Sequence, residues 1–271
     1  MFKTDVEKLR SAHKLLAEFR YDLCPVVKGY ANRTLYINIG ENRIQSKPVD
    51  EKMKRTFTGG RGFCLWLLWN AIRDNTRWND EENELVIAGG PIGGITAYPG
   101  SGKCTVVTIS PLTNTVIDSN SGGYFGPYLK FAGWDALEIQ GKAQSDVIIY
   151  IDGDEGVVRI EEAPLEPEDT HLINRMLTEM YADDPRGLRG ISVISAGQAA
   201  NHNAICGLNV SYYDPRRDEV RIKQAARGGC GRVLRDKKIK AIVVRYSQIS
   251  GDSNGVANMD LIRKAGQRIN R

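Results

Sequence analysis

The chain has 271 residues, of which 41% are hydrophobic and 26% are charged, close to the averages of globular proteins. These proportions exclude a disordered tail, a collagen-like fibre and a low-complexity linker, and the length predicts one large domain or two small ones. The net charge of +4 is spread along the chain and gives no indication of nucleic-acid binding. The longest apolar run, residues 63–69, is far shorter than the roughly 20 residues of a membrane-spanning helix. The first residues lack the apolar segment of a signal peptide, so we expect a cytoplasmic protein with no membrane insertion.

Apolar periodicity predicts the helices and strands. Residues 6–19 carry apolar side chains at spacings of three and four, which predicts an N-terminal helix. Strands are predicted at residues 35–39, 85–88, 105–109, 136–139, 147–151, 157–160, 191–194, 204–210 and 239–244, and helices at residues 51–57, 63–72, 124–132 and 170–181. Residues 110–123 are predicted to form a long polar loop, and a last helix is expected within 256–270.

These elements suggest three parts. Residues 1–27 form an N-terminal helical extension, residues 28–246 a β-rich domain, and residues 247–271 a linker with the start of a helix.

The five cysteines, Cys24, Cys64, Cys104, Cys206 and Cys230, are widely dispersed and form no C-x-x-C pair. This spacing argues against a disulfide framework and against a zinc or iron–sulfur site held by this chain alone, so five buried thiols are expected.

Glycine is unusually frequent, with 28 residues gathered in clusters. Three clusters include a cation: residues 59–62, 100–103 and 227–231. A fourth, residues 119–123, offers amide and hydroxyl groups instead. Glycine-rich backbone can approach an anion closely and cradle phosphate with its N–H groups. Each cluster alone is better explained by a tight turn or close strand packing, but four such clusters in one chain favour a coordinated role.

Familiar nucleotide motifs are missing. The loop before Lys103 departs from the P-loop pattern, because Ala97 stands at its first glycine and Cys104 at its magnesium-binding hydroxyl. No G-x-G-x-x-G joins a strand to a helix. His13 and His171 are expected to be solvated, His202 has no evident partner, and no carboxylate pair stands in an apolar context. The sequence therefore indicates a binding platform more clearly than a catalytic centre.

Taken in series, these loops resemble the N-terminal domain of the tungsten-containing aldehyde:ferredoxin oxidoreductase family. The most specific blocks are S-N-S-G-G-Y-F-G at residues 119–126 and L-K-F-A-G-W-D at residues 129–135, and the resemblance covers residues 28–246. It implies an α+β fold in which a β-rich domain of two sheets forms the base for a tungsten-bis-pyranopterin, with an added N-terminal helix.

The resemblance also implies the binding residues. Lys103 falls where the family has a phosphate-binding arginine, and Asn120 matches a residue whose carbonyl binds Mg²⁺, with Gly122 close by. Lys223 and Gln224 fall on a second phosphate-binding arginine and a second magnesium carbonyl. The other expected cofactor-binding residues, from the same glycine clusters, are Arg61, Gly123 and Arg227. Lysine at position 103 keeps the charge of arginine but loses its bidentate fork.

The family's helical domains, with their [4Fe–4S] cluster and substrate cavity, have no counterpart in these residues. We therefore expect one subunit of a split oxidoreductase, inactive alone, that oxidises aldehydes to carboxylates. A partner chain would hold the cluster and a ferredoxin-like carrier would take the electrons. Two alternatives stay open: a cofactor-free scaffold subunit, and half of a tungsten-dependent aromatic thioester reductase of the benzoyl-CoA type. The substrate and the choice of tungsten or molybdenum are not legible in the sequence.

Overall fold

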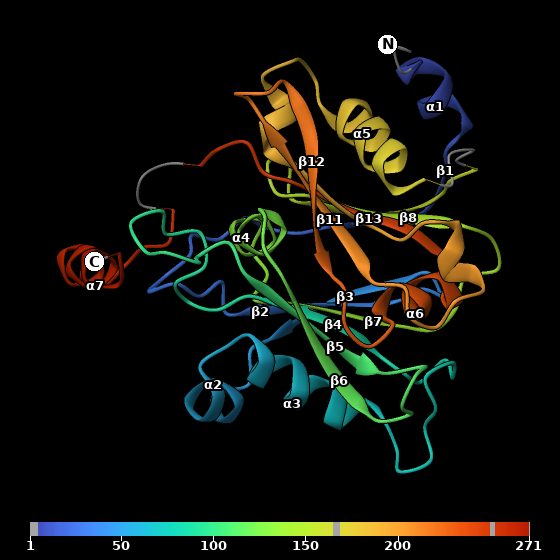
Figure 1. The fold of residues 1–271 in the computed structure, drawn as a ribbon, viewed down its shortest axis with the longest axis horizontal. Coiled ribbons are helices and arrows are strands. Elements are labelled where there is room, and N and C mark those ends of the chain that lie inside the picture. Colours follow the sequence, from blue (N-terminus) through green and yellow to red (C-terminus); the bar gives the residue numbers. More distant parts are fainter. Residues whose placement is uncertain (1–4, 165–168, 250–252, 271) are drawn as a thin grey trace.

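Two mixed β-sheets and the helices around them make up the computed structural model, which describes residues 5–164, 169–249 and 253–270 (Figure 1). The seven-stranded sheet has the order β1-β9-β8-β13-β10-β11-β12 and the six-stranded sheet the order β3-β2-β7-β4-β5-β6. An α+β fold with two sheets is thus confirmed.

The bounds of the elements are as follows. The seven-stranded sheet contains β1 (Lys14–Arg20), β8 (Val147–Asp152), β9 (Val157–Glu162), β10 (Ile191–Ser195), β11 (Leu208–Asp214), β12 (Glu219–Ala225) and β13 (Ile239–Arg245). The six-stranded sheet contains β2 (Arg33–Asn38), β3 (Arg43–Pro48), β4 (Leu85–Ala88), β5 (Cys104–Ile109), β6 (Val116–Ser121) and β7 (Ala136–Gln140). The helices are α1 (Val6–Ala12), α2 (Glu51–Phe57), α3 (Arg61–Ala71), α4 (Phe125–Phe131), α5 (Thr170–Tyr181), α6 (Cys230–Asp236) and α7 (Met259–Ile269), with short 3₁₀ turns η1 (Gly187–Gly190) and η2 (Gln198–Asn201).

The continuous apolar strands are buried on both faces. In β8, Ile149 and Ile151 face the core shared by the two sheets, whereas Ile148 and Tyr150 pack with α5. In β4, Leu85 and Ile87 join the shared core, while the alternate residues pack against α2 and α3. Figure 1 shows these helices on the two outer faces, α5 above and α2 and α3 below. Apolar residues at every position are expected of strands that are covered on both sides.

The predicted N-terminal helix is wrong beyond Ala12. The chain turns extended at His13 and forms β1, which pairs antiparallel with β9 from Lys14↔Glu162 to Arg20↔Val157. Residues 14–20 are so short a segment that their apolar pattern fits both the period of a helix and the period of a strand. The otherwise open edge of β9 decides the outcome, because its N–H and C=O groups find partners in β1.

The predicted polar loop at residues 110–123 is also wrong, since it contains β6. This strand pairs antiparallel with β5, from Cys104↔Ser121 to Ile109↔Val116. It is the last strand of the six-stranded sheet, and several of its side chains are exposed to solvent, where polar residues are tolerated.

The cysteine expectation holds for Cys64, Cys104 and Cys230, which are buried free thiols. It is wrong for Cys24, which is exposed, and Cys206 is half-buried.

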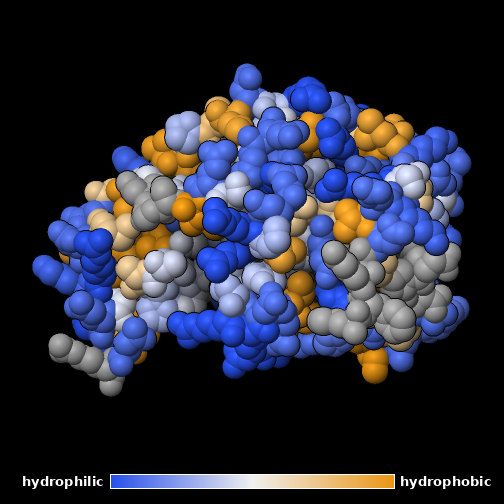
Figure 2. All heavy atoms as spheres, turned by 90° about the horizontal axis from the view of Figure 1, so that it is seen from above, coloured by the Kyte–Doolittle hydropathy of each residue, from blue (hydrophilic) through white to orange (hydrophobic). Residues whose placement is uncertain are grey.

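The surface at the top of Figure 1 is mainly hydrophilic, with hydrophobic residues in small groups (Figure 2). Among the described residues, no helix has the length and apolar character needed to traverse a bilayer.

Candidate cofactor-phosphate site

The glycine clusters predicted from the sequence come together around β5 and β6. A Cβ atom on Gly102 would lie 2.6 Å from the carbonyl oxygen of Gly123, so these two loops touch through bare backbone. A Cβ atom on Gly228 would lie 2.6 Å from Cγ1 of Ile117, which places the loop of residues 227–231 against β6. The amide of Gly60 donates to the carbonyl of Gly89 at 2.7 Å, beside β5. Clusters far apart in the sequence therefore form one region.

Three of the predicted residues line one hollow of about 490 Å³. Asn120 comes from β6, Gln224 from β12, and Arg227 from the loop that follows β12. The two strands are edge strands of different sheets. The backbone N–H of Arg227 donates to Oγ of Ser119 at 3.0 Å and ties the two edges together. The hollow therefore lies at a junction between the sheets.

Arg227 is a cation at the lining of this hollow, and Arg61 pairs with a second charged residue of the lining, Asp118. The guanidinium of Arg61 lies 2.7 Å from the carboxylate of Asp118, which lines the hollow, and their side chains are 60% and 30% exposed. Lys103 and Arg227 are exposed, and neither side chain has an ion-pair partner within the described part of the chain. Lys223 is also exposed, but its Nζ lies 6.0 Å from the centre of the Tyr212 ring and it does not line the hollow.

Polar side chains hold the strands in place at this site. Oγ1 of Thr105 donates to Oδ1 of Asn120 at 2.9 Å, across the β5–β6 pair. This bond occupies the side-chain oxygen of Asn120. Tyr124 and Tyr212 meet edge to face, with ring centres 5.4 Å apart, next to Gly123.

Some glycines here face open space rather than neighbouring atoms. A Cβ atom on Gly90, Gly100 or Gly122 would meet nothing within 4 Å. Close packing therefore does not explain these three glycines, whereas it does explain Gly102, and Gly100 has a φ of +79° that itself favours glycine. Bare backbone beside exposed cations is the arrangement expected where a phosphate group approaches N–H groups closely.

The predicted site is thus brought together in part. Asn120, Gln224 and Arg227 share the hollow, and Arg61 pairs with Asp118 at its lining. Lys103 does not line the hollow, and its neighbour Gly102 contacts Gly123. Gly122 and Gly123 follow directly after β6, at the edge of the same region, and Lys223 lies apart beside Tyr212. Sequence reasoning missed Asp118 and Thr105. The signal for Asp118 was its place just before the S-N-S-G-G block.

The oxygen and nitrogen groups fit a magnesium-bridged phosphate better than a transition-metal cluster. Mg²⁺ prefers oxygen ligands, and Asn120 and Gln224 offer carbonyl oxygens at the hollow, whereas the carboxylate of Asp118 is paired with Arg61. Burial raises the pKa of Cys104 to about 11 and that of Cys230 to about 12, so both thiols stay protonated. Within residues 5–164, 169–249 and 253–270, no group of three or more His, Cys, Asp or Glu side chains is placed to hold a metal ion.

Comparison with known proteins identifies relatives of this chain. Residues 34–246 match the family model "Aldehyde ferredoxin oxidoreductase, N-terminal domain". The tungsten-containing aldehyde ferredoxin oxidoreductase of Pyrococcus horikoshii is 31% identical over 245 residues, which are 90% of this chain and 38% of the relative. That of Pyrococcus furiosus is 33% identical over 222 residues, 81% of this chain and 34% of the relative.

A solved structure is also similar. The active-site complex BamBC of benzoyl coenzyme A reductase, determined with 1,5-dienoyl-CoA, superposes with a TM-score of 0.67 and 26% identity. The match covers 80% of this chain and 31% of that one, so the chain spans about a third of these relatives. On the family match and these identities, the chain belongs to the aldehyde ferredoxin oxidoreductase family, as a member of its N-terminal domain.

Proposed function

We propose that this chain is the subunit of a split tungsten–pterin oxidoreductase that clamps the phosphates of a bis-pyranopterin and their bridging Mg²⁺. The observation that carries the proposal is the hollow in which Asn120, Gln224 and Arg227 meet across two sheets. The open backbone at Gly100 and Gly122 supports it, because bare N–H groups and exposed cations suit a diphosphate.

Each residue has a role that follows from its chemistry. Lys103 and Arg227 neutralise phosphate charge, Arg227 with a planar fork and Lys103 as a point charge, and Lys223 adds charge at the Tyr212 side. Asn120 and Gln224 offer oxygen ligands to Mg²⁺. When bound, the tungsten centre supplies the redox chemistry. The residues of this chain hold and orient the cofactor, and the glycines allow its close approach.

The proposal assigns the remaining parts to other proteins. A partner chain carries the [4Fe–4S] cluster and the substrate site, and a ferredoxin-like carrier takes the electrons in the cytoplasm. The substrate class we favour is aldehydes, which are oxidised to carboxylates. It rests on the names of the relatives, of which this chain matches 38% and 34% of the length.

A second candidate substrate class is an aromatic CoA thioester. The similarity to the benzoyl coenzyme A reductase complex, at a TM-score of 0.67, favours it. Both classes use the same phosphate clamp, so the two candidates differ in the substrate site and share the role proposed for this chain.

The test is metal analysis of the native complex. We expect about one tungsten or molybdenum per chain, together with Mg²⁺ and an iron–sulfur partner, because the clamp binds one cofactor. Lys103→Ala and Arg227→Ala should each lower the metal content while circular dichroism stays unchanged. Arg55→Ala, which removes an exposed cation on α2, is the matched control and should retain the metal.

Each contrary result is informative. Full metal occupancy in both the Lys103→Ala and the Arg227→Ala variants would show that neither residue belongs to the phosphate clamp. An intact complex without metal would instead make the chain a scaffold. Viologen reduction with aldehydes, compared with reduction of an aryl-CoA, separates the two substrate classes.

A further inference from the structure

A second pocket, of about 570 Å³, lies at one end of the seven-stranded sheet. At this end β10 begins, while β11 and β13, which pair antiparallel with it, come to their ends. The lining comes from η1, the end of β11 and the turn after it, the residues that follow β13, and Tyr128 of α4. The pocket shares no lining residue with the phosphate hollow.

Two arginines lie on one side of the 3₁₀ turn that borders this pocket. Arg186 precedes η1 with helical backbone angles, and its carbonyl accepts from the amide of Arg189 at 3.4 Å. Side chains three residues apart in a 3₁₀ turn stand one above the other. Both arginines are exposed and both line the pocket. The turn therefore brings two guanidinium groups to one hollow.

The charge of these arginines is not balanced within the pocket. Neither guanidinium has an ion-pair partner in the part of the chain that the structure describes, and no Asp or Glu of that part lines the pocket. Asp184 instead accepts from two backbone amides of the turn, each at 2.8 Å. Asp214, on the β11 side, pairs with Arg217 at 2.8 Å. Because a guanidinium stays protonated, the lining carries net positive charge at any physiological pH.

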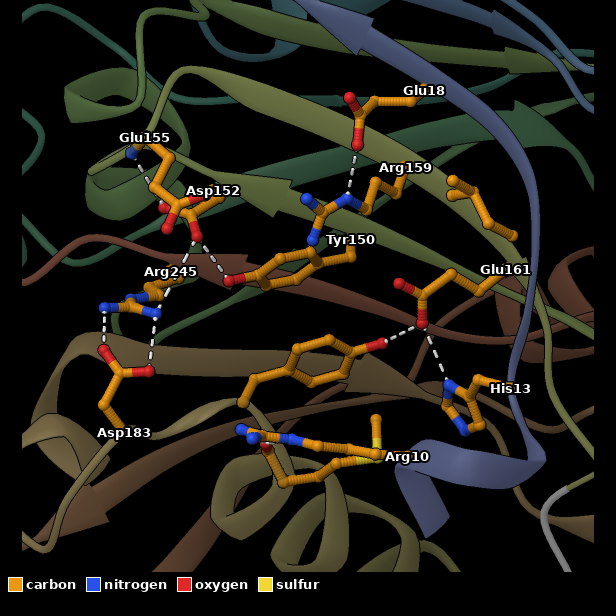
Figure 3. Close-up of a pocket in the computed structure, with 13 residues that line it drawn as sticks. Arg10, His13, Glu18, Tyr150, Asp152, Glu155, Arg159, Glu161, Asp183 and Arg245 are labelled. Carbon is orange, nitrogen blue, oxygen red and sulfur yellow. Dashed lines mark hydrogen bonds and ion pairs between the residues drawn. The ribbon is translucent and has the colours of Figure 1, made fainter. Parts of the chain in front are cut away.

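The charges in the hollow drawn in Figure 3, which lies at α1, β1, β8 and β9, are arranged differently. There Arg159 donates to Glu18 at 2.8 Å, and Arg245 pairs with Asp183 (Figure 3). Asp183 stands shortly before Arg186 in the chain, and its carboxylate is thus already held by another arginine. It does not neutralise the two arginines of the 3₁₀ turn.

Aromatic and apolar side chains form most of the remaining lining. The rings are those of Tyr128, Tyr213 and Tyr246, and Ile249, which is 49% exposed, adds an aliphatic side chain. The ring of Tyr246 packs against Phe131 with ring centres 5.5 Å apart, which fixes its position. A flat apolar body can therefore lie against these groups while its charged end meets the arginines.

Hydroxyl groups add further donors. The hydroxyl of Tyr128 is already engaged, since it donates to the carbonyl of Arg189 at 2.6 Å. The hydroxyls of Tyr246 and Ser247 also belong to lining residues, and neither has a hydrogen-bond partner among residues 5–164, 169–249 and 253–270. A carboxylate accepts several hydrogen bonds, so these donors suit it as well as the guanidinium groups do.

We propose that this pocket binds a small aromatic carboxylate. The carboxylate accepts from Arg186 and Arg189, whose planar forks match its two oxygens, and the ring lies against the tyrosines and Ile249. This site is separate from the phosphate hollow and does not depend on the function proposed for that hollow.

Calorimetric titration of the purified protein tests the proposal with three probes. 3-Phenylpropionate has the expected ring and carboxylate, 3-phenylpropylamine has a similar body with the opposite charge, and acetate lacks the ring. We expect saturable binding of 3-phenylpropionate and none of the amine. Acetate should bind at least about tenfold more weakly than 3-phenylpropionate, because it buries no ring.

Variants of the two arginines locate the site. Arg186→Gln and Arg189→Gln should each weaken binding of 3-phenylpropionate about threefold, and the double variant about tenfold, because each change removes one exposed charge. Both side chains are exposed, so circular dichroism should stay unchanged. Arg55→Gln on α2 and Arg227→Gln at the phosphate hollow are the matched controls and should bind as the unchanged protein does.

Three results would overturn the proposal. The first is an absence of 3-phenylpropionate binding at millimolar concentration, and the second is equal binding of the amine. The third is equal affinity of the double variant and the Arg55→Gln control, which would place the bound acid elsewhere. If Arg227→Gln then loses binding instead, the acid occupies the phosphate hollow.

Discussion

Gly102 and Gly123 meet through bare backbone, since a Cβ atom on Gly102 would come within 2.6 Å of the carbonyl oxygen of Gly123. This contact sets the distance between the loop that carries Lys103 and the segment that follows β6. The relative positions of Lys103 and Gly123, two residues expected at a phosphate clamp, therefore depend on glycine at position 102.

Gly102→Ala should destabilise the protein. The added methyl group meets backbone, which cannot move as a flexible side chain does, so we expect a loss of about 1–3 kcal/mol in the free energy of unfolding. Urea denaturation measures it. An unchanged midpoint would mean that the two loops separate without cost.

Gly122→Ala is the matched variant with the opposite expectation. Nothing lies within 4 Å of the Cβ position at Gly122, so the free energy of unfolding should change by less than about 1 kcal/mol. If phosphate approaches this backbone, the methyl group will obstruct it and the native complex will lose metal. A variant with both normal stability and full metal content would place the cofactor elsewhere.

The ion pair of Arg61 with Asp118 predicts a compensating pair of variants. Asp118 places negative charge in the hollow, and Arg61 neutralises it from 2.7 Å. Arg61→Ala should change stability by less than about 1 kcal/mol, because the pair is largely exposed. It should still lower cofactor retention, since the bare carboxylate repels phosphate.

The double variant Arg61→Ala/Asp118→Asn distinguishes repulsion of phosphate by the unpaired Asp118 carboxylate from a direct contact between Arg61 and the cofactor. Retention should recover when both charges are gone. Continued loss in the double variant would show that Arg61 itself contacts the cofactor. Metal content per chain, measured on the same preparations, reports each case.

Much of the fold is predictable from sequence because its central strands are covered on both faces. Runs such as residues 147–151 and 239–244 are apolar throughout, and the structure confirms them as β8 and β13. The helix predicted at residues 51–57 is likewise confirmed as α2, and Asp50 caps it by accepting from the amide of Met53 at 2.7 Å.

The edge strands escaped prediction. β3, β6 and β12 carry mixed polar residues, because each lies at or near a sheet edge where one side stays wet. α6 was also missed, since its first turn coincides with the glycine cluster that ends at Gly231. Where solvent rather than another element covers part of a strand or helix, the apolar pattern of its sequence contains too little information to predict it.

The site shows the same division. The glycines and cations of residues 119–123 and 227–231 indicate phosphate binding from the sequence alone. The proximity of these two segments, however, depends on the tertiary structure. β6 and β12 belong to different sheets, and only the packing of those sheets brings Asn120 to Gln224. The expectation that His13 is solvated is wrong for a similar reason: its side chain is 7% exposed and its Nδ1 lies 2.9 Å from Glu161 of β9, which depends on β1 being a strand.

Two buried lysines predict how stability depends on pH. Burial lowers the pKa of Lys237 to about 8 and that of Lys130 to about 8, from the ordinary value of 10.5. Between these limits the unfolded chain binds more protons at these two lysines than the folded chain does, so each lysine makes a contribution to the free energy of unfolding that rises with pH. The buried thiols, whose pKa values are raised, make an opposing contribution above about pH 9. The slope should approach about 1 kcal/mol per pH unit for each lysine. Below pH 8 both lysines are protonated in either state and this dependence disappears.

Lys237→Met isolates one of the two contributions. The side chain is 1% exposed, and its ammonium donates to the carbonyl of Gly141 at 3.1 Å, so methionine replaces the stem and removes the charge. In urea denaturation between pH 8 and pH 10, the free energy of unfolding of the unchanged protein should rise by about 1 kcal/mol per pH unit relative to that of Lys237→Met, a difference in which the titration of the thiols cancels. Arg55→Ala, which alters an exposed group on α2, should show no such pH-dependent difference from the unchanged protein. A constant difference between Lys237→Met and the unchanged protein would show that Lys237 titrates alike in the folded and unfolded chains.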